Sequence, residues 1–276
     1  MSRLTAYIEG IGLLGPALGG WAQAREALAG RAAYASEPRE RTVLPAPAAL
    51  PPAERRRTGA GVKLALAVGL EAVAASGRDA STLSTVFASS GGDGQNCHAI
   101  CETLAGDDRQ LSPTRFHNSV HNAPAGYWSI ATRAMAPSNV LCAYDGSFCA
   151  GLLESLTQAA VDGTPNLLIA FDTDYPLPMR DVRPIPDAFG VALVFAAQPG
   201  ERTLARIEAE LTDAAATPLP DAALEALRAS HPAARALPLC AALAAGENAS
   251  VVLDYLPGLN CRVDITWPDS TGQFRS

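Results

Sequence analysis

Short apolar runs alternate with amphipathic segments along the chain. The apolar runs are bounded by glycine, proline and polar residues and predict strands at 4–14, 84–89, 139–143, 166–172 and 188–197. Apolar residues at helical spacing predict helices at 21–28, from about Val62 to Gly77, 96–104, 125–135 and 147–163. Strands that alternate with helices are typical of a layered α/β fold, a mixed sheet flanked by helices.

The last quarter of the chain has a different pattern. A further strand is expected at 203–211, helical pieces broken by prolines at 218–243, and a hairpin of 250–255 with 261–266. Proline-rich segments at 35–57 and 175–186 predict loops. These shifts indicate a main domain over residues 1–199 and a small α+β appendage over residues 200–276.

Charge and composition exclude several classes of protein. The 276 residues carry a net charge of −7, and 48% are hydrophobic. A chain this acidic is not expected to bind nucleic acid or an anionic membrane. No apolar stretch approaches the ~20 residues of a membrane span, and the N-terminus lacks a signal-peptide pattern. The six cysteines follow no disulfide framework, so we expect mostly buried thiols and a cytoplasmic protein.

The stretch from Leu111 to Gly163 is the centre of the chain. It contains a polar loop, a helix, a short apolar strand expected to be buried, and a sharp turn at 144–146 that leads into another helix. A strand, tight turn and helix place one side chain at a helix N-terminus, where negative charge is favoured. A cysteine there ionises readily and attacks acyl groups. This chain has Asp145 instead.

Four stretches resemble the N-terminal half of a β-ketoacyl synthase, which has the thiolase fold. They are EGIGLLGP, WAQAREALAGRAAY, VFASSGGDG and VLCAYDGSFCAGLLESLTQAAVDGTPNLLIAFDTD, in family order over roughly residues 1–197. The resemblance implies a half-thiolase domain. It also puts Asp145 in the position of the nucleophilic cysteine of this family, and it leaves no room for the half that supplies two catalytic histidines.

Such a chain resembles the short chain-length factors of aryl polyene clusters, and FHNSVHNAPAGYWSIA looks characteristic of that subfamily. The resemblance implies a non-catalytic subunit in fatty acid or polyketide-type biosynthesis. Its partner would be an active β-ketoacyl-ACP synthase in a heterodimer, and acyl carrier protein would dock mainly on that partner. The residues implied to line the partner's acyl tunnel or the interface are Phe116, His117, His121, Tyr127, Trp128, Asn139, Val140, Leu141 and Cys142.

Several candidate residues also have ordinary structural interpretations. Asp145 suits a helix N-cap, although a carboxylate acting on a bound acid or carrier is the alternative. Cys142 and Cys149 suit small core positions. His117 and His121 are four residues apart, but Pro124 argues against the regular helix that a metal site on this spacing needs. The glycines at 91, 92 and 94 do not match a dinucleotide motif, so we expect neither cofactor nor metal.

Two other functions stay open at this stage. One is an independent acyltransferase or thioesterase that uses Cys142, Cys149 or Ser147 with His121. The other is a homodimeric acyl-binding scaffold. Ser147 lies two residues after Asp145, so the sequence does not form a G-x-S-x-G nucleophile motif.

Overall fold

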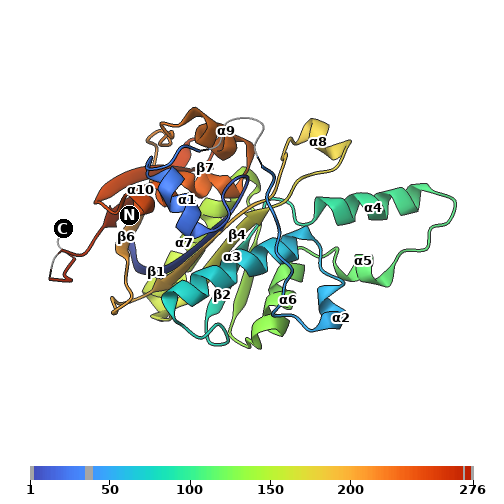
Figure 1. Cartoon of the computed structure of the whole chain (residues 1–276), viewed down its shortest axis with the longest axis horizontal. Coiled ribbons are helices and arrows are strands. Elements are labelled where there is room, and N and C mark those ends of the chain that lie inside the picture. Colours follow the sequence, from blue (N-terminus) through green and yellow to red (C-terminus); the bar gives the residue numbers. More distant parts are fainter. Residues whose placement is uncertain (1–2, 35–39, 270, 275–276) are drawn as a thin grey trace.

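A single mixed sheet forms the centre of the molecule (Figure 1). The computed structural model describes residues 3–34, 40–269 and 271–274. Within them the sheet has eight strands in the order β3-β2-β4-β5-β1-β6-β8-β7. Strand β2 runs parallel to β3 and β4, and the other neighbours are antiparallel. The strands are β1 (Leu4–Leu14), β2 (Ser84–Ala88), β3 (Ser138–Leu141), β4 (Asn166–Asp172), β5 (Phe189–Ala196), β6 (Ala205–Thr212), β7 (Ala249–Leu256) and β8 (Leu259–Thr266).

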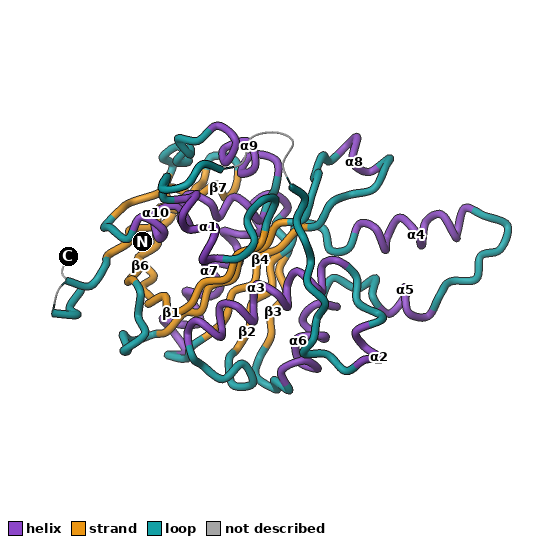
Figure 2. The backbone as a smooth tube through the Cα atoms, in the orientation of Figure 1, coloured by secondary structure: helices purple, strands orange, loops and turns teal. Residues whose placement is uncertain are grey.

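Helices cover both faces of the sheet (Figure 2). The helices are α1 (Trp21–Leu28), α2 (Pro52–Arg55), α3 (Ala60–Ser76), α4 (Gly94–Ala105), α5 (Pro113–His117), α6 (Ala123–Thr132), α7 (Ser147–Asp162), α8 (Met179–Val182), α9 (Ala222–Ser230) and α10 (Leu237–Ala245), with 3₁₀ turns η1 (Tyr144–Gly146) and η2 (Ala233–Ala236). Helices α3 and α6 belong to one hydrophobic core, and α1, α7, α9 and α10 to the other. The α/β layered fold expected from the sequence is confirmed.

The position of strand β4 between two layers of helices explains why its sequence is an almost continuous apolar run. All seven residues are buried. Leu168 and Ala170 belong to the core beneath α7, whereas Leu167, Ile169 and Phe171 belong to the core beneath α3. A strand with both faces covered reads as a continuous apolar run rather than an alternating one. This arrangement fixes β4 inside the sheet, whereas the elbow turn follows the edge strand β3.

Two glycines of the opening motif let α3 lie directly on β1. A Cβ atom at Gly10 would lie 2.1 Å from the carbonyl oxygen of Ala72, and one at Gly12 would lie 2.0 Å from that of Val68. Real Cβ atoms do not approach backbone this closely, so larger residues would push the helix off the strand. The EGIGLLGP stretch therefore encodes a close contact between helix and strand.

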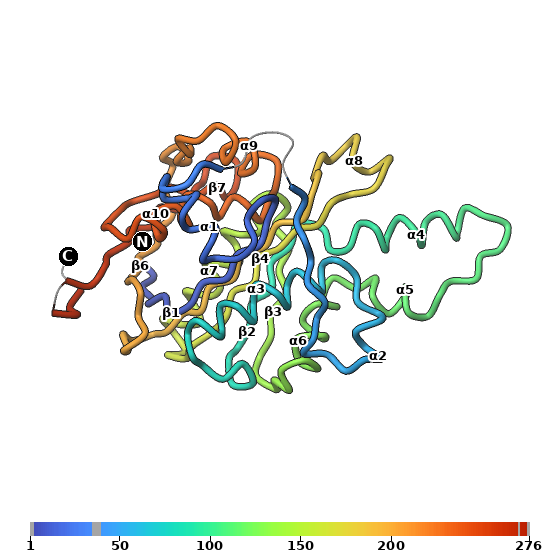
Figure 3. Tube along the Cα trace, in the orientation of Figure 1, coloured from blue at the N-terminus to red at the C-terminus, as the bar shows by residue number. Residues whose placement is uncertain are grey.

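The C-terminal segment continues the same sheet. Strand β6 pairs with β1, and the β7–β8 hairpin extends the sheet beyond it. In Figure 3, the orange and red segments of α9, β7 and α10 lie around the blue α1. The division at residue 199 stays a prediction, but the strands on either side of it share one sheet and one core.

Three local expectations are corrected by the structure. The strand expected to be buried at 139–143 is β3, which ends at Leu141 and has exposed residues at Ser138 and Asn139. It is exposed because it is an edge strand with β2 on one side only. The loop expected before residue 123 contains helix α5, and the 175–186 loop contains α8. Helices α4 and α5 form an arm that extends away from the sheet (Figure 3).

Candidate functional site

The strained residue of the elbow turn is Tyr144. Strand β3 leads into the 3₁₀ turn η1 and then into α7, as the sequence pattern predicts. Tyr144 has a φ of 52°, a region that residues with a side chain rarely adopt. The hydroxyl of Ser147 donates to the Tyr144 carbonyl at 2.6 Å and accepts from the backbone N–H of Ala143 at 3.0 Å. These two bonds close the turn, so Ser147 has a structural role here.

Asp145 is held by two arginines from distant parts of the chain. Its carboxylate accepts from Arg183 at 2.8 Å and from Arg235 at 3.1 Å. The expectation that Asp145 caps α7 is wrong: the residue at the cap position is Gly146, and no side chain caps this helix. The carboxylate turns away from the helix because two guanidinium groups offer stronger, charge-assisted hydrogen bonds.

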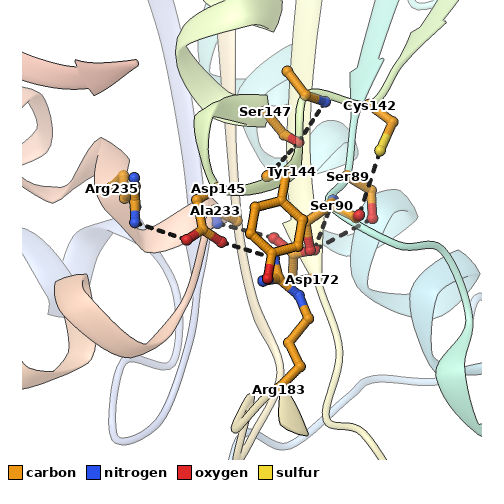
Figure 4. Close-up of polar contacts among 11 residues, drawn as sticks. Ser89, Ser90, Cys142, Tyr144, Asp145, Ser147, Asp172, Arg183, Ala233 and Arg235 are labelled. Atoms are coloured by element: carbon orange, nitrogen blue, oxygen red, sulfur yellow. Dashed lines mark hydrogen bonds and ion pairs between the residues drawn. The ribbon is translucent and has the colours of Figure 1, made fainter. Parts of the chain in front are cut away.

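Arg183 also contacts Tyr144 (Figure 4). Its guanidinium carbon lies 3.7 Å from the centroid of the Tyr144 ring, which is a cation–π distance. Burial acts to lower the pKa of Arg183, but the hydrogen bond that Arg183 donates to Asp145 and the charge of Asp145 outweigh it and raise the pKa, so this arginine stays charged. The Tyr144 side chain is 61% exposed. The elbow therefore presents an exposed aromatic ring backed by an arginine.

A buried carboxylate lies behind the elbow, and sequence reasoning missed it. Asp172, at the end of β4, is 3% exposed. It accepts from the Ser90 hydroxyl at 2.6 Å, from the Ser90 N–H at 2.9 Å and from the Ala233 N–H at 2.9 Å (Figure 4). Burial raises the pKa of Asp172 to about 6, although these donors and nearby Arg183 oppose the rise. The sequence signal for this buried carboxylate was an acidic residue, Asp172, at the end of an otherwise apolar run.

The thiols near the elbow are poorly arranged for catalysis. Cys142 is exposed and donates to the Ser90 carbonyl at 3.3 Å. Cys149 is buried in the first turn of α7, and the neighbouring Cys261 thiol together with desolvation raises the pKa of Cys149. A raised pKa disfavours the nucleophilic thiolate. The expectation of mostly buried cysteines is only half right, since Cys97, Cys101 and Cys142 are exposed; the first two lie on the projecting arm.

The two histidines of the central stretch contact different groups. His121 makes a 3.1 Å hydrogen bond through Nε2 with the carbonyl of Ser89. His117 is on α5, and its ring lies edge-on to that of Tyr127 at 6.5 Å. In the part of the chain that the structure describes, no group of three or more His, Cys, Asp or Glu residues is placed to hold a metal ion. The Gly-rich loop after β2 instead places Ser89 and Ser90 against Asp172.

The expected tunnel residues divide into buried and exposed positions. Tyr127 and Trp128 are 2% and 1% exposed, respectively, and Phe116 is 67% exposed. The hydroxyl of Tyr127 donates to Asn118 at 3.1 Å. Trp128 lies under α3, with its ring centroid 6.4 Å from that of Phe87. Trp128 therefore packs inside the core of this chain.

The remaining expected interface residues lie on and beside β3. Val140 and Leu141 are half-buried, whereas Asn139 and Cys142 are exposed. The amide of Asn139 donates to Glu154 on α7 at 2.8 Å. In this way β3 is attached to the body of the fold along one side and is open along the other.

The chain matches the family model described as β-ketoacyl synthase, N-terminal domain, over residues 22–253. The chain belongs to the β-ketoacyl synthase family. None of the curated proteins matches it. In this β-ketoacyl synthase relative, the elbow and strands β2 to β6 lie within the matched region, whereas β1 and β8 lie outside it.

Solved structures of ketosynthase complexes share the fold at low identity. One is the ketosynthase ApeO in complex with its chain length factor ApeC from Xenorhabdus doucetiae, with a TM-score of 0.71, 22% identity, and 95% and 99% of the two chains covered. The ishigamide ketosynthase/chain length factor has a TM-score of 0.69 and 16% identity, with 95% of this chain and 99% of the other covered. The AntDE:AntF complex of a type II polyketide acyl-carrier protein with its ketosynthase has a TM-score of 0.70 and 10% identity, with 96% of this chain and 99% of the other covered. At these identities the similarity shows the fold, which confirms the mixed α/β architecture expected from the sequence. None of the described helices is long and apolar enough to cross a membrane.

Proposed function

We propose that this chain is a chain-length-factor-like subunit of the aryl polyene type, which pairs with an active β-ketoacyl-ACP synthase in the cytoplasm. It would shape the acyl tunnel of that partner without catalysing condensation itself. Acyl carrier protein would then dock mainly on the partner. The observation that carries this proposal is the open edge of β3 beside an elbow that has no thiol.

The free edge of β3 has defined hydrogen-bonding groups. The carbonyls of Pro137 and Leu141 accept from the N–H groups of Thr85 and Ser89 on the β2 side. Because successive carbonyls of a strand point in opposite directions, the backbone groups of Val140 face away from β2. An unpaired strand edge is a ready template for pairing with another chain.

Two exposed apolar side chains precede this edge in the chain. Met135, three residues before β3, is 94% exposed, and Ile130 on α6 is 46% exposed. Exposed apolar side chains suit a surface that a partner covers. Two of the similar structures contain a ketosynthase and a chain length factor, and this pairing makes a ketosynthase the favoured partner.

The independent-enzyme alternative finds less support in the geometry. The hydroxyl of Ser147 is engaged in closing the elbow turn, and the Cys149 thiol is held protonated. Cys142 and His121 both contact the loop formed by Ser89 and Ser90, but each through a backbone carbonyl. A homodimeric scaffold would use the same β3 edge, so the test must separate it from the heterodimer.

The test is a proline substitution on the open edge. Val140→Pro removes the outward N–H and leaves the bonds to β2 in place, and proline is tolerated on edge strands. Val140→Thr keeps both the N–H and the β-branched shape, so it is the matched control. Each variant is co-expressed with a ketosynthase that forms a complex with the wild-type chain and is analysed by gel filtration. We expect Val140→Thr to co-elute with the ketosynthase and Val140→Pro to elute alone.

Two results would contradict the proposal. A folded Val140→Pro variant that still co-elutes would show that the β3 edge is not the interface. A wild-type chain that forms only dimers with itself, even with the ketosynthase present, would favour the scaffold alternative.

A further inference from the structure

A small cleft lies beside the elbow, between the end of β3 and the C-terminal segment. Its volume is about 110 Å³, enough for a few water molecules or a group of similar size. The cleft is lined by charged, polar and apolar residues from three parts of the chain: Asp145, Arg183, Pro184, Ile185, Ala229, Ser230, Pro232 and Arg235. No part of this cleft was predicted as a binding site from the sequence apart from Asp145.

The charges lining the cleft do not cancel. Two guanidinium groups, from Arg183 and Arg235, face one carboxylate, that of Asp145. Each arginine gives Asp145 a hydrogen bond from one terminal nitrogen, so further N–H groups of both remain. The side chains of Arg183, Arg235 and Asp145 are 17%, 22% and 38% exposed, so water only partly screens their charges. The buried carboxyl of Asp172, near Arg183, offsets part of the positive charge.

One buried donor of Arg183, behind the cleft, lacks an acceptor. The Nε atom of Arg183 is buried and has no hydrogen-bond partner among the described residues. A buried N–H without a partner is unfavourable, and native structures usually supply one from protein, water or a ligand. The guanidinium itself cannot turn freely, because it is stacked on the Tyr144 ring and bonded to Asp145.

We propose that this cleft binds a small oxyanion, a carboxylate or a phosphate group, between Arg183 and Arg235. Planar guanidinium groups match the geometry of such oxygens and bind them through two parallel hydrogen bonds. Asp145 keeps the two arginines apart and oriented when the cleft is empty of anion, and it competes with the anion for their N–H groups. The site belongs to this chain alone, so it does not depend on the proposed subunit role.

The test measures anion binding to the purified full chain. Inorganic phosphate, acetate and malonate are titrated separately at constant ionic strength against sodium chloride, with isothermal calorimetry and thermal shift as readouts. We expect saturable binding of at least one of these anions and none of chloride. Phosphate as the tightest ligand would identify a phosphate-type site, and acetate or malonate a carboxylate site.

Three variants assign the binding to the cleft. Arg235→Gln removes one guanidinium and should weaken binding about tenfold to a hundredfold, the range for one hydrogen bond to a charged group. Arg262→Gln removes the same charge from a surface pair with Glu210 and should leave the affinity unchanged. Asp145→Asn removes the competing carboxylate and should tighten binding, which a purely structural ion pair would not do.

Each contrary result is decisive. The proposal is overturned if no anion binds saturably, or if Arg235→Gln and Arg262→Gln bind alike. It is also overturned if Asp145→Asn loses binding while its circular dichroism shows a folded protein. If Arg235→Gln does not fold, Arg235→Lys, which keeps the charge but not the planar fork, replaces it and should still weaken binding.

Discussion

At the scale of single residues, Asp172 links three segments that are distant in sequence. It ends β4, accepts bonds from the Ser90 side chain and backbone after β2, and accepts one from Ala233 in η2. Its carboxyl is fully enclosed by protein. A buried carboxyl of this kind makes stability depend on pH, because its charged form is disfavoured in the folded state.

We expect stability to fall as the pH rises through the titration of Asp172. Burial raises its pKa from 3.8 to about 6, so between these values the folded chain holds a proton that the unfolded chain has released. Its contribution is therefore fully present below pH 4 and is lost as the pH passes 6, by about 3 kcal/mol. Urea unfolding from pH 4 to 7 should show this loss in wild type and not in Asp172→Asn. Parallel pH profiles for the two proteins would refute the assignment.

Two neighbouring aromatic residues face different surroundings. Trp128 packs on Phe87 and fills the space over Gly69, where a Cβ would lie 2.6 Å from the indole ring. Tyr127 instead contacts the ring of His117 and the side chain of Asn118, both from the region of the projecting arm. The proposed role in setting acyl chain length therefore rests on Tyr127, and Trp128 is a natural comparison.

Alanine substitutions should separate these roles. Trp128→Ala should lower the free energy of unfolding by about 3–5 kcal/mol, because it empties a packed core. It should not change the length of the product made by the reconstituted ketosynthase pair. Tyr127→Ala should lengthen the product if its ring closes the tunnel. Product mass is compared for wild type and both variants in complexes shown to be intact, and an unchanged length for Tyr127→Ala would remove this residue from the tunnel.

At the scale of elements, periodicity was a reliable guide where both faces of an element are covered. Helix α3 and strand β4 appear where the sequence predicted them, since most of α3 is buried in one core and β4 lies between both cores. For β3 the same reasoning failed, because a short apolar run looks alike in a central strand and at an edge. Only the neighbours of a strand decide which it is, and those neighbours are distant in sequence.

The contact between α3 and β1 gives an element-scale prediction. Gly12→Ala would place a methyl group 2.0 Å from the Val68 carbonyl, so helix and strand must separate. We expect a loss of about 1–3 kcal/mol or more in unfolding free energy. Gly126→Ala on α6 is the matched control, because a Cβ at Gly126 meets nothing within 4 Å. Equal melting temperatures for the two variants would contradict the close approach.

The elbow site was only partly predictable for a related reason. The strand, turn and helix follow from local pattern, and so does the presence of Asp145 in the turn. Its partners do not, since Arg183 and Arg235 are 38 and 90 residues further along the chain. Long-range ion pairs have no sequence period, and a helix cap was the best local guess for an aspartate at this position. The position of the strained residue, Tyr144, also required the backbone angles.

At the scale of the whole molecule, the elbow turn of this β-ketoacyl synthase relative consists of Tyr144, Asp145 and Gly146 and so contains no thiol. Among the residues near that turn, Cys149 is buried with a raised pKa, Ser147 closes the turn, and His121 is bonded to a backbone carbonyl. Nucleophilic catalysis needs a nucleophile within hydrogen-bonding reach of a base. The described residues contain no such pair at the elbow.

We therefore expect no covalent acyl transfer to the isolated chain. The purified protein is incubated with acyl and malonyl carrier proteins and analysed by intact mass, with the co-purified ketosynthase complex as the positive control. The complex should carry the acyl group on the ketosynthase, while this chain keeps its unmodified mass. Tyr144→Cys, which puts a thiol at the strained position of the turn, should become acylated at most and form no condensed product, because no base stands beside it. A stoichiometric thioester on the wild-type chain, lost in Cys142→Ser, would instead establish the independent acyltransferase.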